Sequence, residues 1–228
     1  MNNPQSTGRL VGGLVLAQFL GGILVNFVLT APLFGEPGFL INASAHSGRI
    51  ALSALVGIVL GMLSVVIAIS VHSVVRDRAR NLTLFLLALA TVSLAATVVE
   101  QMNVISMLSL SKAYAAASVA EQADFQGLRL VVAAARNSSH YIGLAVAGLM
   151  LLVFYVTLFR TKLIPRALAG FGVAAAFVQV IAVAMPLFGK SIVFFLLAPL
   201  GGCQLVLGLW LLAKGFREIQ DTGNRVGA

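Results

Sequence analysis

Residues 50–74 read IALSALVGIVLGMLSVVIAISVHSV and contain no Lys, Arg, Asp or Glu. A helix that crosses a bilayer needs roughly 20 consecutive apolar residues, and this segment supplies them. Similar apolar runs recur along the chain and predict six membrane spans, at about residues 10–34, 50–74, 82–108, 138–159, 167–188 and 191–213. We therefore expect an all-α integral membrane bundle of six transmembrane helices, with residues 1–228 forming a single domain.

The composition supports a membrane protein and argues against a soluble one. Hydrophobic residues make up 60% of the chain and charged residues 10%, whereas charged residues are about a quarter of an average soluble domain. The mean hydropathy is +1.02. In a soluble domain a formal net charge of +8 would suggest nucleic-acid binding, but here it indicates loops that face anionic lipid. We expect the lipid bilayer as a partner and no nucleic acid.

The distribution of Lys and Arg predicts the orientation of the spans. An even number of spans places both termini on one side of the membrane. Ten cations fall on that side and five on the other. The ten are Arg9, Arg76, Arg78, Arg80, Arg160, Lys162, Arg166, Lys214, Arg217 and Arg225, and the five are Arg49, Lys112, Arg129, Arg136 and Lys190. Because cytoplasmic loops carry the excess of Lys and Arg, both termini are predicted to be cytoplasmic.

The loop between the third and fourth spans, residues 111–137, is the only long one. It is rich in Ala, has no Pro and has a single Gly, so we expect it to be helical and extracytoplasmic. An unbroken helix from Leu128 to Phe159 would be about 48 Å long and would extend beyond a hydrocarbon layer of about 30 Å. Gly57 and Gly61 allow close helix packing, either inside the bundle or in a homo-oligomer or larger complex.

A carboxylate interrupts the third span, where residues 97–103 read TVVEQMN. A charge at the middle of a bilayer costs about 2.5 to 3.5 kcal/mol on insertion scales, so Glu100 needs a partner, a neutral form or an interfacial depth. Thr97, Glu100 and Asn103 share one face of a helix with Ser93. Counting from Asn81 places Glu100 about 27 Å along the helix, in the outer leaflet.

Other polar residues are predicted at a similar depth: Asn26, Arg49, Arg136, His140 and Gln179. We predict that they form, with the face of Glu100, an outward-opening polar pocket that binds a ligand. In that pocket Glu100 would be neutralised by Arg49, Arg136 or His140. The alternative is an interfacial ion pair that only holds two helices together.

The sequence does not indicate a metal or haem site, and we assign no catalytic residues. His46 and His140 are the only imidazoles near the predicted pocket, without a haem-attachment motif or a spacing that would place them on one helix face. We therefore do not expect haem or metal to bind through them. Pro199 is predicted to bend the sixth span.

The fourth and fifth spans carry a recognisable pattern: an I-G-L entry to a helix, a Gly in its middle, an Arg, a short spacer, P-R, and an L-x-G that begins the next span. The residues are Ile142, Gly143, Leu144, Gly148, Arg160, Pro165, Arg166, Leu168 and Gly170. This pattern resembles the bacterial membrane-protein family known as domain of unknown function 4386. Gly48 with Arg49, and Glu100 late in the third span, extend the similarity. The resemblance implies a six-span protein of the bacterial inner membrane and implies no activity.

Three classes of function fit these features. The leading prediction is a noncatalytic binding, sensor or accessory-subunit protein with an outward-opening polar pocket. One alternative is a membrane enzyme that acts on a lipid-phase substrate with Glu100 and His140 as acid and base. The other is a small-molecule or ion transporter, although the chain shows no obvious inverted repeat.

Overall fold

The computed structural model describes residues 3–218, and the elements in that part of the chain are helical. The long helices are α1 (Pro4–Ile23), α4 (Ser47–Ala116), α5 (Phe125–Thr161), α6 (Arg166–Ala184) and α7 (Ala198–Lys214). The short ones are a π-helix (Leu24–Leu29), α2 (Ala31–Phe34), α3 (Phe39–Ala45) and 3₁₀ turns at Glu121–Ala123, Met185–Phe188 and Phe194–Leu197. Arg225, which enters the charge count above, lies outside the described residues. Within the described residues, five helical segments are long and apolar enough to cross a membrane.

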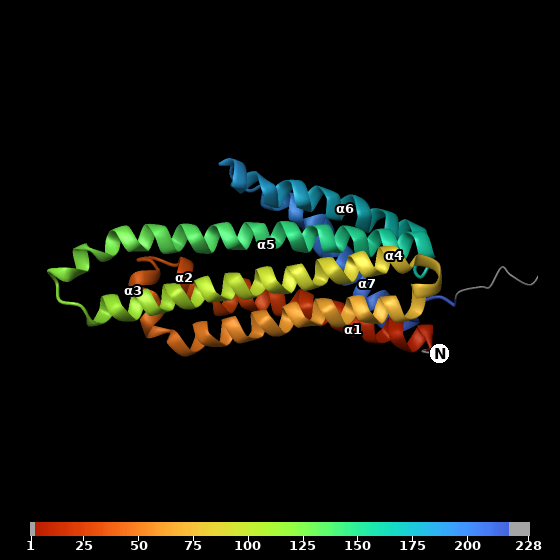
Figure 1. Ribbon diagram of the computed structural model, residues 1–228, viewed down its shortest axis with the longest axis horizontal. Helices are drawn as coiled ribbons and strands as arrows, with labels where there is room; N and C mark the ends of the chain where they lie inside the picture. The colour runs from red at the N-terminus through yellow and green to blue at the C-terminus, as the bar shows by residue number, and fades with distance from the viewer. Residues whose placement is uncertain (1–2, 219–228) are drawn as a thin grey trace, which may run out of the picture.

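Helix α4 doubles back on itself, so it runs along the bundle twice (Figure 1). Its 70 residues would span about 105 Å if straight, several times a hydrocarbon layer of about 30 Å. The bend lies at Ala79, whose φ of −143° and ψ of 38° are not helical. The two arms pack side by side, since Nδ1 of His72 lies 2.7 Å from Oγ1 of Thr83. The predicted runs 50–74 and 82–108 are these two arms.

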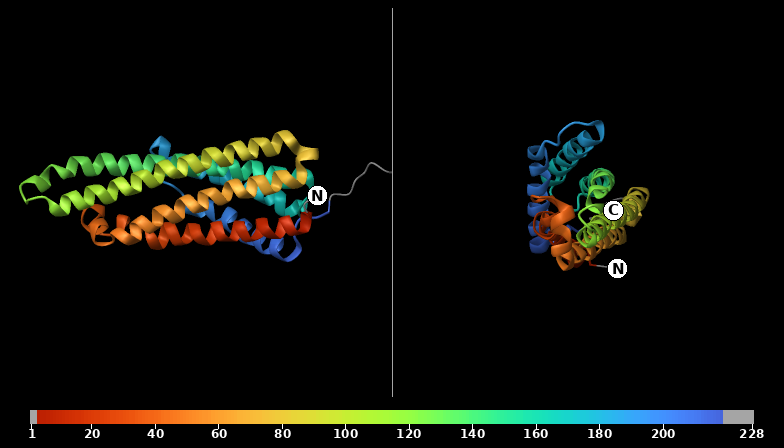
Figure 2. Two further views of the ribbon diagram at one scale, coloured as in Figure 1. Left: turned by 60° about the horizontal axis from the view of Figure 1, so that its bottom comes forward. Right: turned by 90° about the vertical axis from the view of Figure 1, so that its left-hand side faces the viewer.

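One end of the bundle collects the bend of α4, the start of α1, the α5–α6 connection and the end of α7, and we call it the bend end (Figure 2). The backbone at Gly8 of α1 lies against Gly215 and Phe216. The N–H of Arg217 donates to the carbonyl of Leu163, 2.9 Å away, in the α5–α6 connection. The described chain therefore begins and ends at the same end of the bundle.

At the opposite end, the second arm of α4 and helix α5 project beyond the other helices, and we call this the tip end (Figure 1). Helix α5 runs unbroken for 37 residues, about 55 Å. The predicted helical state of residues 111–137 holds for most of that segment, because α4 continues to Ala116 and α5 starts at Phe125. Ser111 links the second arm of α4 to α3. Its Oγ accepts a hydrogen bond from the N–H of Ser44 at 2.8 Å and donates one to the carbonyl of Leu40 at 2.8 Å.

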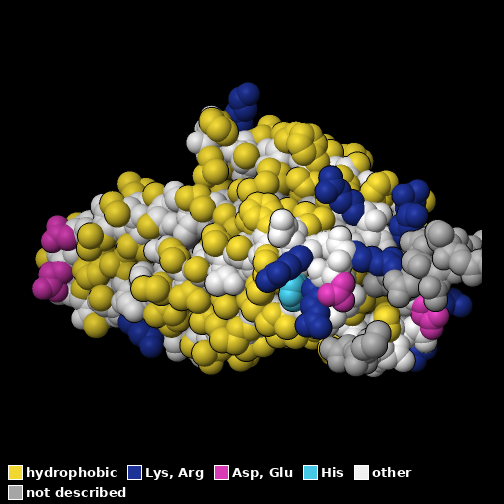
Figure 3. Space-filling view, turned by 45° about the vertical axis from the view of Figure 1, so that its right-hand side comes forward, with side chains coloured by type: hydrophobic (Ala, Val, Ile, Leu, Met, Phe, Trp, Pro, Cys, Tyr) yellow, Lys and Arg dark blue, Asp and Glu magenta, His cyan; other side chains and the backbone are white. Residues whose placement is uncertain are grey.

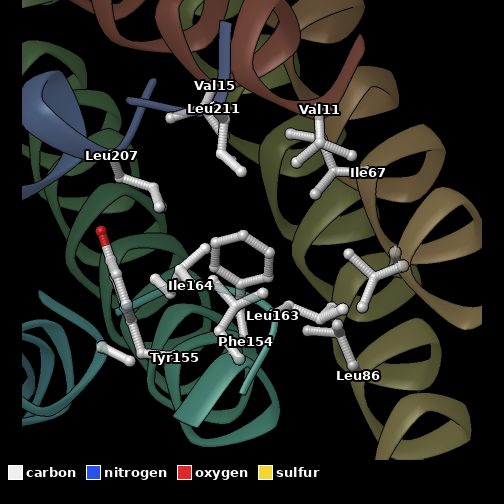
Figure 4. Close-up of a cluster of buried hydrophobic side chains, with 14 of the residues drawn as sticks. Val11, Val15, Ile67, Leu86, Phe154, Tyr155, Leu163, Ile164, Leu207 and Leu211 are labelled. Carbon is white, nitrogen blue, oxygen red and sulfur yellow. The ribbon is translucent and has the colours of Figure 1, made fainter. Parts of the chain in front are cut away.

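The main core lies between α1, α4, α5 and α7, near the bend end (Figure 4). The close-up labels Val11, Val15, Ile67, Leu86, Phe154, Tyr155, Leu163, Ile164, Leu207 and Leu211 in this cluster. The Tyr155 ring occupies the space that a side chain at Gly172 would need, so α5 and α6 approach closely there. Many large apolar side chains remain on the outside, among them Phe27 (74% exposed), Phe194 (71%) and Phe195 (82%). An apolar surface of this extent is suited to lipid, and the chain is a multi-pass membrane helical bundle.

Two local features differ from the sequence expectation. The first predicted span is not one regular helix: α1 widens into the π-helix at Leu24–Leu29, and Thr30 donates to the carbonyl of Val25 at 2.9 Å before α2 begins. Pro199 lies in the first turn of α7, directly after the 3₁₀ turn Phe194–Leu197. Its missing N–H has no helical partner to lose there, so it stands at the start of α7 rather than inside it. Gly57 and Gly61 face the second arm of α4, at Gln101 and Leu94, so this pair packs inside the bundle.

Candidate functional site

The site is built around Glu100, on the second arm of α4, and two residues one turn apart on α5. Oε1 of Glu100 lies 3.2 Å from an Nη of Arg136 and 2.7 Å from Nδ1 of His140. The side chains are 16% (Glu100), 7% (Arg136) and 18% (His140) exposed. Residues four apart in a helix lie on the same face, so α5 presents both partners to the carboxylate. The structure thus selects Arg136 and His140 from the three predicted partners.

Both of these contacts use one oxygen of Glu100. An ionised carboxylate only accepts hydrogen bonds, so in the ionised form of Glu100 the proton of this hydrogen bond lies on Nδ1 of His140. The other oxygen, Oε2, accepts no hydrogen bond from residues 3–218 and retains some exposed surface. It lies 3.9 Å from the position that a Cβ at Gly143 would take. Because residue 143 is a glycine, it places no side chain of its own between α5 and Oε2.

Arg136 is anchored from two directions. One Nη binds Glu100, and its guanidinium carbon lies 4.7 Å from the centre of the Phe34 ring. A guanidinium over an aromatic ring gains about 0.5 to 2 kcal/mol. The Nε of Arg136 is buried and has no partner among the described residues. Phe34 comes from α2, so the irregular end of the first span reaches over the charged pair.

Polar contacts continue from Glu100 in both directions along α4. Asn103 donates its Nδ2 to Oγ of Ser139 on α5, 3.0 Å away. Thr97 donates to the carbonyl of Ser93 at 3.0 Å and packs beside Gly61 of the first arm. The predicted polar stripe therefore faces protein, with Glu100 and Asn103 directed at α5.

Two of the predicted pocket residues, Arg49 and Asn26, have other partners, and a third, Gln179, lies beside another part of α5. Arg49 donates to the backbone carbonyl of Val28, and Asn26 donates to the carbonyl of Gly22 at 2.9 Å. Gln179 of α6 is half-buried and lies beside Gly148 of α5. The cluster at Glu100 is thus smaller than the predicted set and is formed by α2, α4 and α5.

Sequence reasoning missed Phe34, Ser139 and Gly143 as parts of this site. Ser139 and Gly143 could have been found, because they lie three and seven residues after Arg136 and so share its helix face. Phe34 could not, since its contact depends on the path of the chain after the π-helix.

The described residues give little support for a metal site. No three His, Cys, Asp or Glu side chains come together within residues 3–218. His46 uses its Nδ1 on the carbonyl of Asn42, 2.9 Å away, while His140 binds Glu100.

A second polar region lies in the main core, where Gln18, Ser64, Gln204 and Tyr155 line a cavity of about 20 Å³. That volume suits a single water molecule. Gln18 donates to Oγ of Ser64 at 2.7 Å, and the buried hydroxyl of Tyr155 has no partner among the described residues. This cavity is too small for an organic ligand.

Comparison with known proteins gives one match. The family described as Domain of unknown function (DUF4386) matches residues 10–215. No curated protein and no solved structure matches the chain.

Proposed function

The chain belongs to the family described as Domain of unknown function (DUF4386), and we propose that it is a noncatalytic binding protein of the bacterial inner membrane. In this proposal the chain crosses the bilayer six times, with both termini in the cytoplasm, and binds a ligand at Glu100 from the outer side. It would act as a sensor or as an accessory subunit.

The two arms of α4 support six crossings. Each arm is long enough to cross a hydrocarbon layer of about 30 Å, and with α1, α5, α6 and α7 they make six passes along the bundle. The cations at the bend of α4 and at the α5–α6 connection support a cytoplasmic bend end, by the positive-inside rule. The tip end, with residues 117–124, would then stand outside the membrane.

The observation that carries ligand binding is the unequal use of the two oxygens of Glu100. Arg136 and His140 hold Oε1, while Oε2 keeps free accepting capacity beside Gly143. A carboxylate that served only to pair two helices would gain most by using both oxygens, as in a bidentate pair with Arg. A ligand with an ammonium or hydroxyl donor would complete the hydrogen bonding of Oε2.

Binding explains this geometry better than acid–base catalysis by Glu100 and His140. A general base must take up a proton from the substrate, whereas the guanidinium of Arg136 on Oε1 opposes protonation of Glu100. The His140 ring also contacts the ring of Tyr141 on α5, with their centroids 5.5 Å apart. The arrangement is suited to presenting a fixed acceptor.

Mass spectrometry of small molecules that copurify in a mild detergent tests this proposal. The wild type is compared with Glu100→Gln, which keeps the shape of the side chain and removes its charge. Glu121→Gln serves as the control, because Glu121 is an exposed acid at the tip end. We expect a donor-bearing molecule that is retained by the wild type and the control and lost from Glu100→Gln. The same molecules in the same amounts on all three proteins would refute ligand binding at Glu100.

A further inference from the structure

The bend end holds a second cavity, about 630 Å³ in volume, between the bend of α4 and the end of α5. Its wall carries five cationic side chains and one carboxylate: Arg76, Arg78, Arg80, Arg160, Lys162 and Asp77. Two segments that are far apart in the sequence thus contribute to one cavity. The non-helical backbone at Ala79 turns the chain between Arg78 and Arg80, and this turn places the arginines of α4 at the end of the bundle.

Among the residues that the structure describes, the lining of this cavity carries five cations and one acid. Asp77 lies 3.7 Å from Arg76, and both side chains are largely exposed, at 92% and 66%, so this pair is screened by water and weak. Figure 3 shows Lys and Arg side chains gathered toward one end of the molecule, next to a surface that is mostly apolar. The cationic cavity therefore borders the surface that faces lipid.

Arginine side chains favour a particular class of anion. The planar guanidinium donates in a fixed fork that matches the oxygens of a phosphate, and four of the five cations in this cavity are Arg. Basic pockets at the cytoplasmic ends of transmembrane helices are suited to anionic headgroups. The volume of about 630 Å³ accommodates a phosphate with its substituents. We infer that the cavity between the bend of α4 and the end of α5 binds a phosphate group, carried by an anionic lipid or free in the cytoplasm.

Titration of lipids onto the detergent-purified protein, followed by native mass spectrometry, tests this site. Phosphatidylglycerol should bind more tightly than phosphatidylcholine. Arg80→Gln and Arg160→Gln, on the two sides of the cavity, should each weaken the binding of phosphatidylglycerol about fivefold. One cation near the surface contributes about 1 kcal/mol to the binding of an anionic headgroup. Arg9→Gln is the matched control, because Arg9 is exposed on α1 and does not line the cavity. The two variants lie in different helices, so if one of them fails to fold, the other still tests the cavity.

Calorimetric titration of inorganic phosphate into the protein in phosphatidylcholine nanodiscs distinguishes the two sources. Heat of binding that is lost in Arg80→Gln and Arg160→Gln, without a preference for phosphatidylglycerol, assigns the site to a soluble phosphate. A preference for phosphatidylglycerol that these variants lose, without heat from phosphate, assigns it to a lipid headgroup. The inference fails if neither ligand binds, or if Arg9→Gln weakens binding as much as the cavity variants do.

Discussion

Removing both charges of the Glu100–Arg136 pair is expected to destabilise the protein by less than the sum of the two single losses. Loss of one partner from a buried ion pair costs about 3 to 5 kcal/mol. The side chain of Glu100 keeps 16% exposure, so partial hydration reduces this cost. Glu100→Gln leaves Arg136 against the Phe34 ring alone, and we expect a loss of about 2 to 3 kcal/mol in the free energy of unfolding. Arg136→Gln leaves Glu100 with His140, and the expected loss is about 1 to 2 kcal/mol.

The double variant Glu100→Gln with Arg136→Gln should lose only about 1 to 2 kcal/mol, because no unpaired charge remains, which gives a coupling of about 2 to 3 kcal/mol. The free energies are measured by titrating protein in mixed micelles with sodium dodecyl sulfate and following the fluorescence of Trp210, the single tryptophan. Glu121→Gln should change stability by less than about 0.5 kcal/mol, as an exposed substitution does. If the losses of the single variants add in the double variant to within about 0.5 kcal/mol, Glu100 and Arg136 are not coupled and the reasoning fails.

Two further predictions concern the packing of the helices and use the same unfolding assay. Gly172→Ala should destabilise by about 1 to 3 kcal/mol, because its methyl group would meet the Tyr155 ring, while Gly170→Ala, which has only ordinary contacts, should be neutral or slightly stabilising. Equal effects at the two glycines would contradict the close approach of α5 and α6. Ser111→Ala should cost about 1 to 3 kcal/mol, because it leaves buried backbone groups of α3 without their partner. The exposed Ser109→Ala is its control, and a Ser111→Ala as stable as that control would show that the bridge contributes nothing.

The apolar runs were enough to predict the helical membrane architecture, because hydrocarbon requires long uninterrupted helices. The bend at Ala79 was located only to within the polar residues between two spans. In the structure the non-helical backbone is confined to Ala79, and the helix continues on both sides of it. The π-helix at Leu24–Leu29 has no signal in the sequence, since its residues are as apolar as those of α1. Apolarity predicts that a segment is helical and does not distinguish one helical winding from another.

Helix geometry alone decides part of the contacts around Glu100. The polar face of α4 and the shared face of Arg136 and His140 follow from the helical repeat. The depth argument was less selective: it grouped Arg49 and Asn26 with Glu100, although each has a backbone partner on or near the first span. Residues at one depth can lie on different sides of a bundle, and packing decides which of them meet.

A ligand can bind at Glu100 from the outer side only if water reaches Oε2 from outside the cell. Thiol labelling at residue 143 measures this access of water directly. Gly143→Cys is made in a Cys203→Ala background, which removes the only native thiol, and intact cells are treated with a small charged methanethiosulfonate. A Cβ at residue 143 has only ordinary contacts, near Oε2 of Glu100 and Ala96. Gly202→Cys on α7 is the control, because it borders the apolar groove between α6 and α7.

We predict that the thiol at residue 143 reacts and the thiol at residue 202 does not, because only an ionised, hydrated thiolate attacks the reagent and displaces its sulfinate. A thiol at residue 143 that is as unreactive as the one at residue 202, in cells where Ala117→Cys at the tip end is labelled, would contradict an outward-facing site at Glu100.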